Sequence, residues 1–227
     1  MTPLQPQLDA IRNGFEPKVP PEVLAVMHRA NADLTDRADA AVPIGTTMPS
    51  FELANAEGKT VRSDDLLAGG PLVVSFFRGA WCPYCIAELA ALNEALPAIR
   101  QAGAEVVVVT PQTRERSATM KAEKGLDLNV LTDRGLAYAD RLGLTFTLPA
   151  DLVAIYTKFG LDIPATNGAD MANGADAGAD AWRLPMPARL VVAPDGTIVE
   201  RDVNPDYSIR PEPEATLDAV RRVASGR

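Results

Sequence analysis

Cysteine and histidine are nearly missing from this chain of 227 residues, which has two cysteines and one histidine, His28. A closed zinc site needs four protein ligands, so this chain could form one only with carboxylates or with ligands from a second copy. His28 has no recognisable partner in the sequence, and we expect a surface or interface residue rather than a catalytic base. The two cysteines are therefore the main candidates for chemistry.

Long apolar runs are absent as well, and no stretch approaches the roughly 20 residues of a membrane-spanning helix. Residues 1–13 are polar and interrupted by proline, unlike a signal peptide. The chain has 30 acidic and 22 basic side chains, and its net charge of −8 disfavours nucleic acids and anionic membranes as partners. We therefore expect a cytoplasmic protein, in a compartment where disulfides are usually transient and catalytic.

The two cysteines lie three residues apart in the motif C-P-Y-C, from Cys82 to Cys85. The run Leu72–Phe77 before them is apolar, β-branched and aromatic, which predicts a buried strand. After them, apolar residues recur at steps of three and four, which predicts a helix over 83–101. Arg78–Trp81 is a short break between the two elements. Cys82 is thus expected at the N-terminus of a helix, directly after a strand.

A redox thiol is most easily made at such a turn, because the thiolate is the reactive form and a free cysteine titrates near about 8.5. The unpaired N–H groups and the positive dipole end of the helix favour the anion. Arg78 is a further candidate for positive charge nearby. Residues i and i+3 face the same side of a helix, so Cys85 can reach Cys82 and close a disulfide. We predict that Cys82 is the exposed attacking thiolate and Cys85 its more buried partner.

Three other interpretations of the cysteine pair remain. A structural disulfide over a two-residue gap would close a very small loop and constrain the unfolded chain little. Half of a zinc site would need carboxylates or a second subunit to complete the ligand set. Finally, the two cysteines could be inert core residues.

The sequence also divides into a helical extension and a main domain. Residues 1–41 have helical periodicity, with a proline-led helix start at Pro20-Pro21. We expect this extension to pack on the main domain or to form a contact in a homodimer. The main domain is assigned to residues 42–227. Within it the stretch 165–181 is small, acidic and glycine-rich, which favours a flexible surface insertion over calcium binding through its aspartates.

The main domain is predicted to be of the α/β class. Two apolar strands, Leu72–Phe77 and Glu105–Thr110, joined by a helix, are typical of a parallel β-α-β unit covered on both faces. Further elements are predicted as a hairpin over 51–62, helices over 114–123, 137–142, 151–159 and 213–224, a short strand over 129–131 and a hairpin over 188–203.

The segment F-F-R-G-A-W-C-P-Y-C resembles the thioredoxin superfamily, in which a strand, a tryptophan and a C-x-x-C motif follow one another. More narrowly, the chain resembles peroxiredoxin-like proteins of the alkyl hydroperoxide reductase/thiol-specific antioxidant (AhpC/TSA) family over most of 42–223. The proline-tyrosine pair inside the motif is the pair found in glutaredoxins. The segments that carry the family resemblance are Gly45–Leu53, Gly70–Glu88 and Asp206-Tyr207 with Arg210.

The resemblance implies a thioredoxin-like fold, a mixed central sheet flanked by helices. In that superfamily a cis-proline opens the third core strand beside the C-x-x-C motif. Pro187, preceded by Met186, takes that place, so the resemblance predicts a cis Met186–Pro187 peptide bond. Trp81 and Tyr84 would wall the site, and Arg78 and Pro187 are further substrate-binding candidates.

The chain departs from the family pattern at named positions. Typical peroxiredoxins have a P-x-x-x-(T/S)-x-x-C signature that positions the peroxide. If the signature ends at Cys85, Arg78 replaces its proline and Cys82 replaces its hydroxyl residue. The buried aspartate of thioredoxins is replaced by Phe76. Neither the peroxide site nor the proton relay therefore transfers residue by residue.

We predict a thiol oxidoreductase that needs no cofactor, either a thiol peroxidase or a thiol–disulfide oxidoreductase. Cys82 would attack a small hydroperoxide or a disulfide, and Cys85 would resolve the adduct as an internal disulfide. A thioredoxin- or glutathione-like thiol would then restore the pair. A second hypothesis is a homodimeric [2Fe–2S] electron or cluster carrier, in which Cys82 and Cys85 of two copies supply four thiolates.

Overall fold

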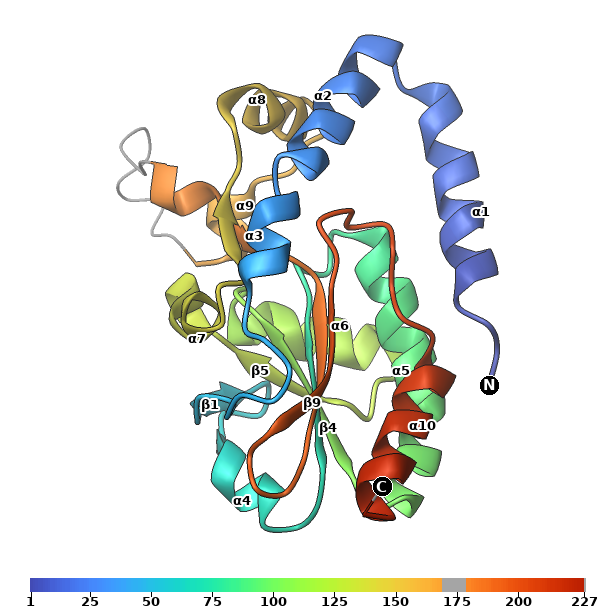
Figure 1. Ribbon diagram of the computed structural model, residues 1–227. Helices are drawn as coiled ribbons and strands as arrows, with labels where there is room; N and C mark the ends of the chain where they lie inside the picture. The colour runs from blue at the N-terminus through green and yellow to red at the C-terminus, as the bar shows by residue number, and fades with distance from the viewer. Residues whose placement is uncertain (169–178, 227) are drawn as a thin grey trace.

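The computed structural model describes residues 1–168 and 179–226, and these form a mixed sheet with helices on both faces (Figure 1). The seven-stranded sheet has the order β2-β1-β5-β4-β3-β8-β9, and a second sheet pairs β6 with β7. The strands are β1 (Glu52–Asn55), β2 (Thr60–Arg62), β3 (Leu72–Phe76), β4 (Glu105–Thr110), β5 (Asn129–Thr132), β6 (Thr145–Thr147), β7 (Arg183–Pro185), β8 (Ala188–Val192) and β9 (Ile198–Val203).

The helices fall into an N-terminal group and a group that alternates with the strands. The helices are α1 (Gln5–Phe15), α2 (Pro21–Ala32), α3 (Thr35–Ala40), α4 (Ser63–Leu67), α5 (Pro83–Gln101), α6 (Arg114–Lys124), α7 (Ala137–Arg141), α8 (Ala150–Lys158), α9 (Ile163–Thr166) and α10 (Pro213–Ala224). Short 3-10 turns lie at Glu16–Lys18, Arg134–Leu136 and Ala179–Trp182. Within the described residues, no helix is both long enough and apolar enough to cross a membrane.

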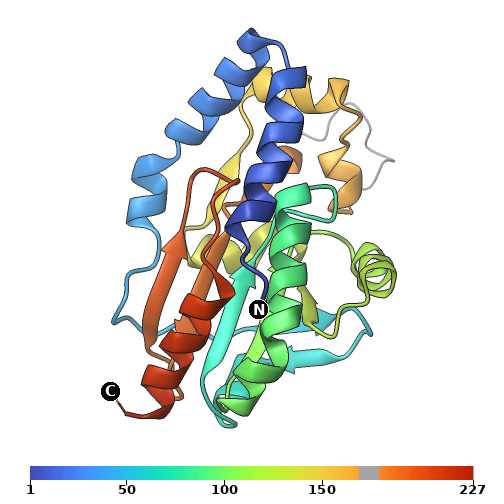
Figure 2. The same cartoon turned by 90° about the vertical axis from the view of Figure 1, so that its right-hand side faces the viewer.

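The central strands are buried on both faces, as their unbroken apolar runs predict. Val73, Val106 and Val108 point into a core formed with α1, α5, α6 and α10. Their neighbours Val74 and Val107 point into the opposite core, which includes α7 and the segment before β1. Figure 2 shows α1, α5 and α10 in front of the sheet. The parallel β3-α5-β4 unit and the sheet flanked by helices are therefore confirmed.

The N-terminal helices pack over one end of the main domain. Glu212, just before α10, accepts hydrogen bonds from the backbone N–H groups of Leu4 and Gln5, both at 2.8 Å. A carboxylate in this position satisfies unpaired donors at the start of α1 and complements its dipole. Met27 of α2 lies in a third apolar cluster with Tyr156 of α8. The helices of the extension are thus fastened to the main domain at both the C-terminal segment and α8.

The predicted cis bond at Pro187 is wrong: all peptide bonds between described residues are trans, including Met186–Pro187. Strand β7, which the sequence did not predict, ends two residues before β8 begins. The N–H group of Met186 donates a hydrogen bond to the carbonyl of Leu144 at 2.7 Å, which fixes the backbone before the proline. The bond therefore follows the ordinary trans preference of X-Pro peptides.

The predicted insertion at 165–181 lies largely outside the described residues. Its first residues belong to the end of α9 and the turn after it, and its last belong to the 3-10 turn Ala179–Trp182. The hairpin strands β1 and β2, helix α5 and helix α10 begin and end within one or two residues of their predicted limits. The small sheet of β6 and β7 is an addition that the sequence pattern did not indicate.

A glycine pair at the edge of the β3-α5-β4 unit provides a test of the packing. Gly70 has φ = +145°, and an added Cβ atom would lie 2.1 Å from the carbonyl oxygen of Gly103. We expect Gly70→Ala to lower the free energy of unfolding by about 2–4 kcal/mol, because backbone must move to admit the methyl group. Urea denaturation measures the change. Gly14→Ala in α1 is the control, since its Cβ meets nothing within 4 Å, and it should stabilise by up to about 1 kcal/mol.

Candidate active site

Cys82 and Cys85 lie where β3 passes into α5, as the sequence predicts. Cys82 is the residue that precedes the first helical turn; its N–H donates to the carbonyl of Gly79 at 3.1 Å, and its carbonyl accepts from Ile86 at 3.1 Å. Pro83 occupies the first helical position, where a missing N–H costs nothing. Cys85 follows three residues after Cys82, inside the first turn. Both are free thiols.

The prediction of an exposed Cys82 is wrong, because Cys82 is 2% exposed and Cys85 is 0% exposed. The cover comes from elements distant in sequence. A cavity of about 240 Å³ remains in front of Cys82, and Cys85 is not among the residues that line it. Its apolar and aromatic walls include Ile11 and Phe15 of α1, Met27 of α2, Tyr156 of α8, and Phe159 and Leu161 just after α8. Only Cys82 of the pair therefore faces a space that could hold a substrate.

Three of the four predicted substrate-binding residues line this cavity, namely Arg78, Trp81 and Tyr84. The ring of Tyr84 packs edge to face against Tyr207, with centroids 5.7 Å apart. Pro187 is buried directly before β8, but it does not line the cavity. Its predicted role at the site stays a prediction.

Arg78 is a buried cation held by aromatic rings. Its guanidinium carbon lies 4.4 Å from the ring centroid of Tyr207 and 4.7 Å from that of Trp81, and its Nη2 donates to the hydroxyl of Tyr156. Cation–π contacts of this kind stabilise a charge that has lost its water. The sequence indicated a positive charge at Arg78, whereas only the tertiary structure shows that its guanidinium lies close enough to Cys82 to lower the pKa of that thiol.

The two thiols have opposite pKa shifts. Burial alone would raise the pKa of Cys82, but a hydrogen bond from Cys85 and the charges of Arg78 and Arg210 lower it to about 6. Burial raises the pKa of Cys85 well above its usual value, and the neighbouring Cys82 sulfur raises it further. The pair therefore holds one thiolate, on Cys82, and one thiol, on Cys85, near neutral pH.

A buried ion cluster lies behind Cys85. The carboxylate of Glu88 accepts hydrogen bonds from Arg210 Nε at 2.6 Å, from Arg189 Nη2 at 2.7 Å and from Ser75 Oγ at 3.1 Å. The side chains of Glu88, Arg189 and Arg210 are each 1–2% exposed. Arg210 Nη2 also lies 3.5 Å from Cys85 Sγ. With two cations and one anion, the cluster leaves a net positive charge against the thiol pair.

Sequence reasoning assigned no site role to Glu88, Arg189 or Tyr156, and named Arg210 and Tyr207 only within the family resemblance. Two features of the sequence could have indicated the buried ion cluster. Glu88 lies three residues after Cys85 on the inward face of its helix, and Arg189 interrupts an otherwise apolar strand. Charged residues are almost never fully buried unless they are paired, so charges at two inward positions predict a buried ion pair.

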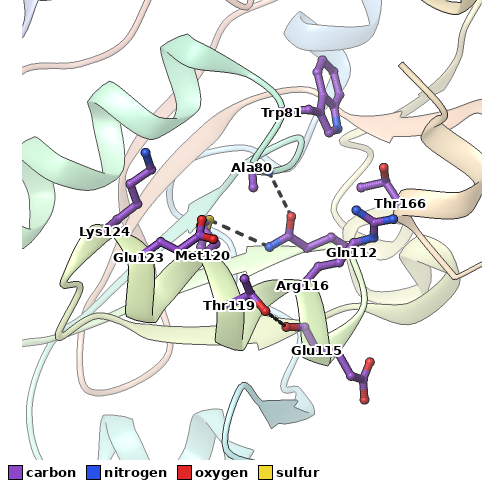
Figure 3. A pocket seen from close by; sticks show the side chains of 10 residues that line it. All are labelled: Ala80, Trp81, Gln112, Glu115, Arg116, Thr119, Met120, Glu123, Lys124 and Thr166. Carbon is purple, nitrogen blue, oxygen red and sulfur yellow. Dashed lines mark hydrogen bonds between the residues drawn. The ribbon is translucent and has the colours of Figure 1, made fainter. Parts of the chain in front are cut away.

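Gln112, two residues before α6, stabilises the turn that precedes Cys82. Gln112 accepts a hydrogen bond from the N–H of Ala80 at 3.0 Å and donates to Ser117 Oγ at 3.0 Å. It lies in a second cavity of about 490 Å³, lined largely by polar side chains of α6 and by Trp81 (Figure 3). Gly79 permits the Trp81 ring to lie close, because a Cβ there would be 2.5 Å from the indole nitrogen. Neither cysteine lines this second cavity.

The residues present do not fit a shared [2Fe–2S] cluster. Such a cluster between two subunits needs the four thiolates at a common surface, but Cys82 is 2% exposed and Cys85 is 0% exposed. Within the described ranges, no three side chains of His, Cys, Asp or Glu are grouped so that they could hold a metal ion. His28 is exposed, as expected, and lies 3.7 Å from the Glu16 carboxylate.

Comparison with known proteins identifies the family. The model of the AhpC/TSA family matches residues 44–201. This chain belongs to the AhpC/TSA family. It is 33% identical to the thiol-disulfide oxidoreductase ResA of Geobacillus thermodenitrificans over 95 residues, or 41% of this chain and 53% of ResA. It is 29% identical to the chloroplastic peroxiredoxin Q of Sedum lineare over 113 residues, or 50% and 58% of the two chains. This chain thus spans about half the length of these curated relatives.

Solved structures confirm the predicted fold. Peroxidoxin BcpB from Mycobacterium tuberculosis superposes with a TM-score of 0.60 at 17% identity, over 80% of this chain and 98% of the other. Peroxiredoxin Q of Xanthomonas campestris gives a TM-score of 0.57 at 17% identity, over 82% and 99%. The fold is therefore that of the thioredoxin-like peroxiredoxins. The helices α1, α2 and α3 precede the part that matches the family model.

The pKa of Cys82 can be tested directly. A folded-state pKa lowered to about 6 means that the thiolate is populated above pH 6 and is lost as the pH falls below it. We expect the ultraviolet absorbance of one thiolate per chain to appear across this range, and Cys82→Ser to remove it. Arg78→Gln should raise the midpoint by about one unit, since a nearby cation is lost. Arg29→Gln, at an exposed ion pair with Asp151, should not. A midpoint above about 8 in the unmodified protein would contradict the assignment.

Proposed function

We propose that this protein is a thiol oxidoreductase whose Cys82–Cys85 pair reduces small hydroperoxides. One observation carries the proposal: Cys82 combines a lowered pKa with a place in the wall of a cavity, beside the buried cation Arg78. Membership of the AhpC/TSA family supports the same chemistry. A cytoplasmic location fits a redox-active pair of this kind, because disulfides there are usually transient and catalytic.

The first step forms a sulfenic acid on Cys82. Its thiolate attacks the terminal oxygen of R–O–OH, the O–O bond breaks, and the leaving alkoxide takes a proton from water to become R–OH. The peroxide oxygen is reduced and the sulfur is oxidised by two electrons. The Arg78 guanidinium stabilises the negative charge as it passes from sulfur to the leaving oxygen, and the dry surroundings strengthen this effect.

The second step closes the disulfide. Cys85 enters as a thiol, attacks the Cys82 sulfur and forms the S–S bond, while the hydroxyl group leaves as water with the proton of Cys85. Arg210, 3.5 Å from Cys85 Sγ, stabilises the negative charge that develops on this sulfur. An external thiol then reduces the disulfide by exchange and restores both thiols. Burial of the pair favours a small glutathione-like thiol, whereas a thioredoxin-like protein would need the covering helices to move. These steps need no further cofactor.

Reduction of disulfides is a second candidate, supported by the similarity to a thiol-disulfide oxidoreductase. The same thiolate would attack a disulfide sulfur in place of the peroxide oxygen. Burial of Cys82 favours small oxidants, because a protein disulfide cannot reach a sulfur that is 2% exposed without movement of the covering helices.

Single cysteine variants test the two roles. Cys82→Ser should lose hydroperoxide reduction by at least about a hundredfold, because the nucleophile is gone. Cys85→Ser should consume one equivalent of peroxide and stop with a sulfenic acid on Cys82, detected by dimedone labelling and mass spectrometry. The readout is peroxide consumption together with the labelled peptide. Dimedone on Cys85 in the Cys82→Ser variant would reverse the assigned roles, and full turnover by that variant would refute the proposal.

A further inference from the structure

We propose that the polar cavity beside α6 binds the reducing thiol, a small peptide thiol with an amino-acid group at one end and a carboxylate at the other. Glutathione has this chemistry, with an ammonium and a carboxylate on its γ-glutamyl end, a central cysteine and a terminal glycine carboxylate. The inference rests on the proposed function, because the thiol acts on the Cys82–Cys85 disulfide. It assigns a role to a cavity that neither cysteine lines.

The α6 cavity is bordered by charges that are free to bind a ligand. Its lining includes Arg116, Glu123 and Lys124, and none of these three forms an ion pair with another described residue. Glu115 also belongs to the lining, but it pairs with Arg114 at 3.3 Å and points away from the other side chains (Figure 3). Two cations and one anion therefore remain for a ligand.

The order of these charges along α6 matches a peptide with two different ends. Lys124 lies eight residues after Arg116, about 12 Å along the helix axis, and Figure 3 shows their charged groups on opposite sides of the cavity. Glu123 is the neighbour of Lys124, so an anion and a cation occur together at one end only. That end is complementary to an ammonium–carboxylate pair, and Arg116 is complementary to a single carboxylate. An extended tripeptide spans about 10 Å, which suits this separation.

The middle of the cavity has a buried floor and borders the turn before Cys82. Gln112 and Met120, which are 0% and 3% exposed, lie with Ala80 between the charged ends (Figure 3). The volume of about 490 Å³ lies in the range that is typical of small-molecule sites. The central cysteine of a bound peptide is therefore expected beside Ala80, two residues before Cys82.

Trp81 separates the expected position of the peptide thiol from Cys82. It lines both the α6 cavity and the apolar cavity in front of Cys82. Its indole N–H makes no hydrogen bond to a described residue. The ring is held by Arg78, whose guanidinium carbon is 4.7 Å from its centroid, and by Tyr156, with ring centroids 5.8 Å apart. A turn of this side chain breaks no hydrogen bond and would give the peptide thiol access to the Cys82 sulfur.

Reduction of the disulfide then uses two peptide thiols. The bound thiolate attacks the Cys82 sulfur, the S–S bond breaks, and Cys85 leaves as a thiolate that takes a proton from water. Cys82 now carries the peptide as a mixed disulfide. A second thiolate from solution attacks the peptide sulfur, and Cys82 leaves as the thiolate that its lowered pKa favours. The two peptide thiols lose two electrons and form one disulfide, and the cysteine pair gains those electrons.

Two forms of the same thiol test the carboxylate contacts. Glutathione should support hydrogen peroxide reduction with a kcat/KM at least about fivefold above that of glutathione diethyl ester, which lacks both carboxylates. The net charge of −8 on the protein favours the cationic ester, so this charge cannot produce the preference. Arg116→Gln combined with Lys124→Gln should bring the ratio to about one. Arg114→Gln, on the same helix but not in the lining, should retain it.

The ammonium contact has its own test. Glutathione should exceed N-acetylglutathione in kcat/KM by about threefold, because acetylation removes the charge that Glu123 would bind. Glu123→Gln should remove this difference, whereas Glu214→Gln, an exposed carboxylate on α10, should keep it. Loss of the difference in both variants, or in neither, would contradict the assignment of this end.

A binding experiment separates the site from the proposed function. S-methylglutathione keeps both charged ends but has no thiol, and it should bind the unmodified protein in calorimetric titrations. Arg116→Gln with Lys124→Gln should weaken this binding about fivefold or more, and Arg114→Gln should not. Binding of this kind, without hydroperoxide turnover with any thiol, would retain the site and refute the proposed function.

Two results would overturn the inference and leave the proposed function standing. The first is peroxide reduction supported equally by glutathione and its diethyl ester, with no measurable binding of S-methylglutathione. The second is peroxide reduction supported by a thioredoxin but by neither form of glutathione.

Discussion

The buried ion cluster of Glu88, Arg189 and Arg210 is the interaction on which the structure and the chemistry both depend. It joins α5, β8 and the segment before α10, three elements that the chain reaches far apart in sequence. Removing one partner from such a cluster would leave an uncompensated buried charge. Because the cluster carries one more cation than anions, it also favours negative charge on the adjacent thiol pair. The fold thus contains a charge imbalance that a thiolate at Cys82 partly offsets.

Burial of the thiol pair has consequences for reactivity and access. Removal of water strengthens the attraction between the Cys82 thiolate and Arg78, and it allows the aromatic rings to hold a guanidinium without an acid partner. The same burial limits which molecules reach the sulfur. Reactivity and selectivity are therefore linked, since both depend on the cover formed by α1, α2 and α8. A protein that lost the extension would expose its thiolate to water and weaken the electrostatic effect that maintains it.

Two predictions from the sequence were wrong, one about the exposure of Cys82 and one about the peptide bond before Pro187. Cys82 was expected to be exposed because it lies at a helix N-terminus directly after a strand, and Pro187 was expected to follow a cis bond because of the resemblance to the thioredoxin superfamily. Residues of α1, α2 and α8, all distant from the motif in sequence, line the cavity in front of Cys82. Local patterns do not report what distant segments pack on them. The charges of Glu88 and Arg189 were visible, but their pairing depends on the contact between α5 and β8.

The sequence by itself determined the central strands and helix and the position of the reactive pair. Apolar periodicity is a local property, so it defined β3, α5 and β4 closely, and the strand-to-helix turn then located Cys82 at a helix N-terminus. The tertiary structure alone decided which thiol faces a cavity, how Arg78 is directed and what closes the site. These features depend on residues more than fifty positions apart, such as Phe15 and Cys82, which line the same cavity, and no local pattern contains them. Burial and electrostatics are properties of the assembled fold, because both sum over every element that surrounds the sulfur.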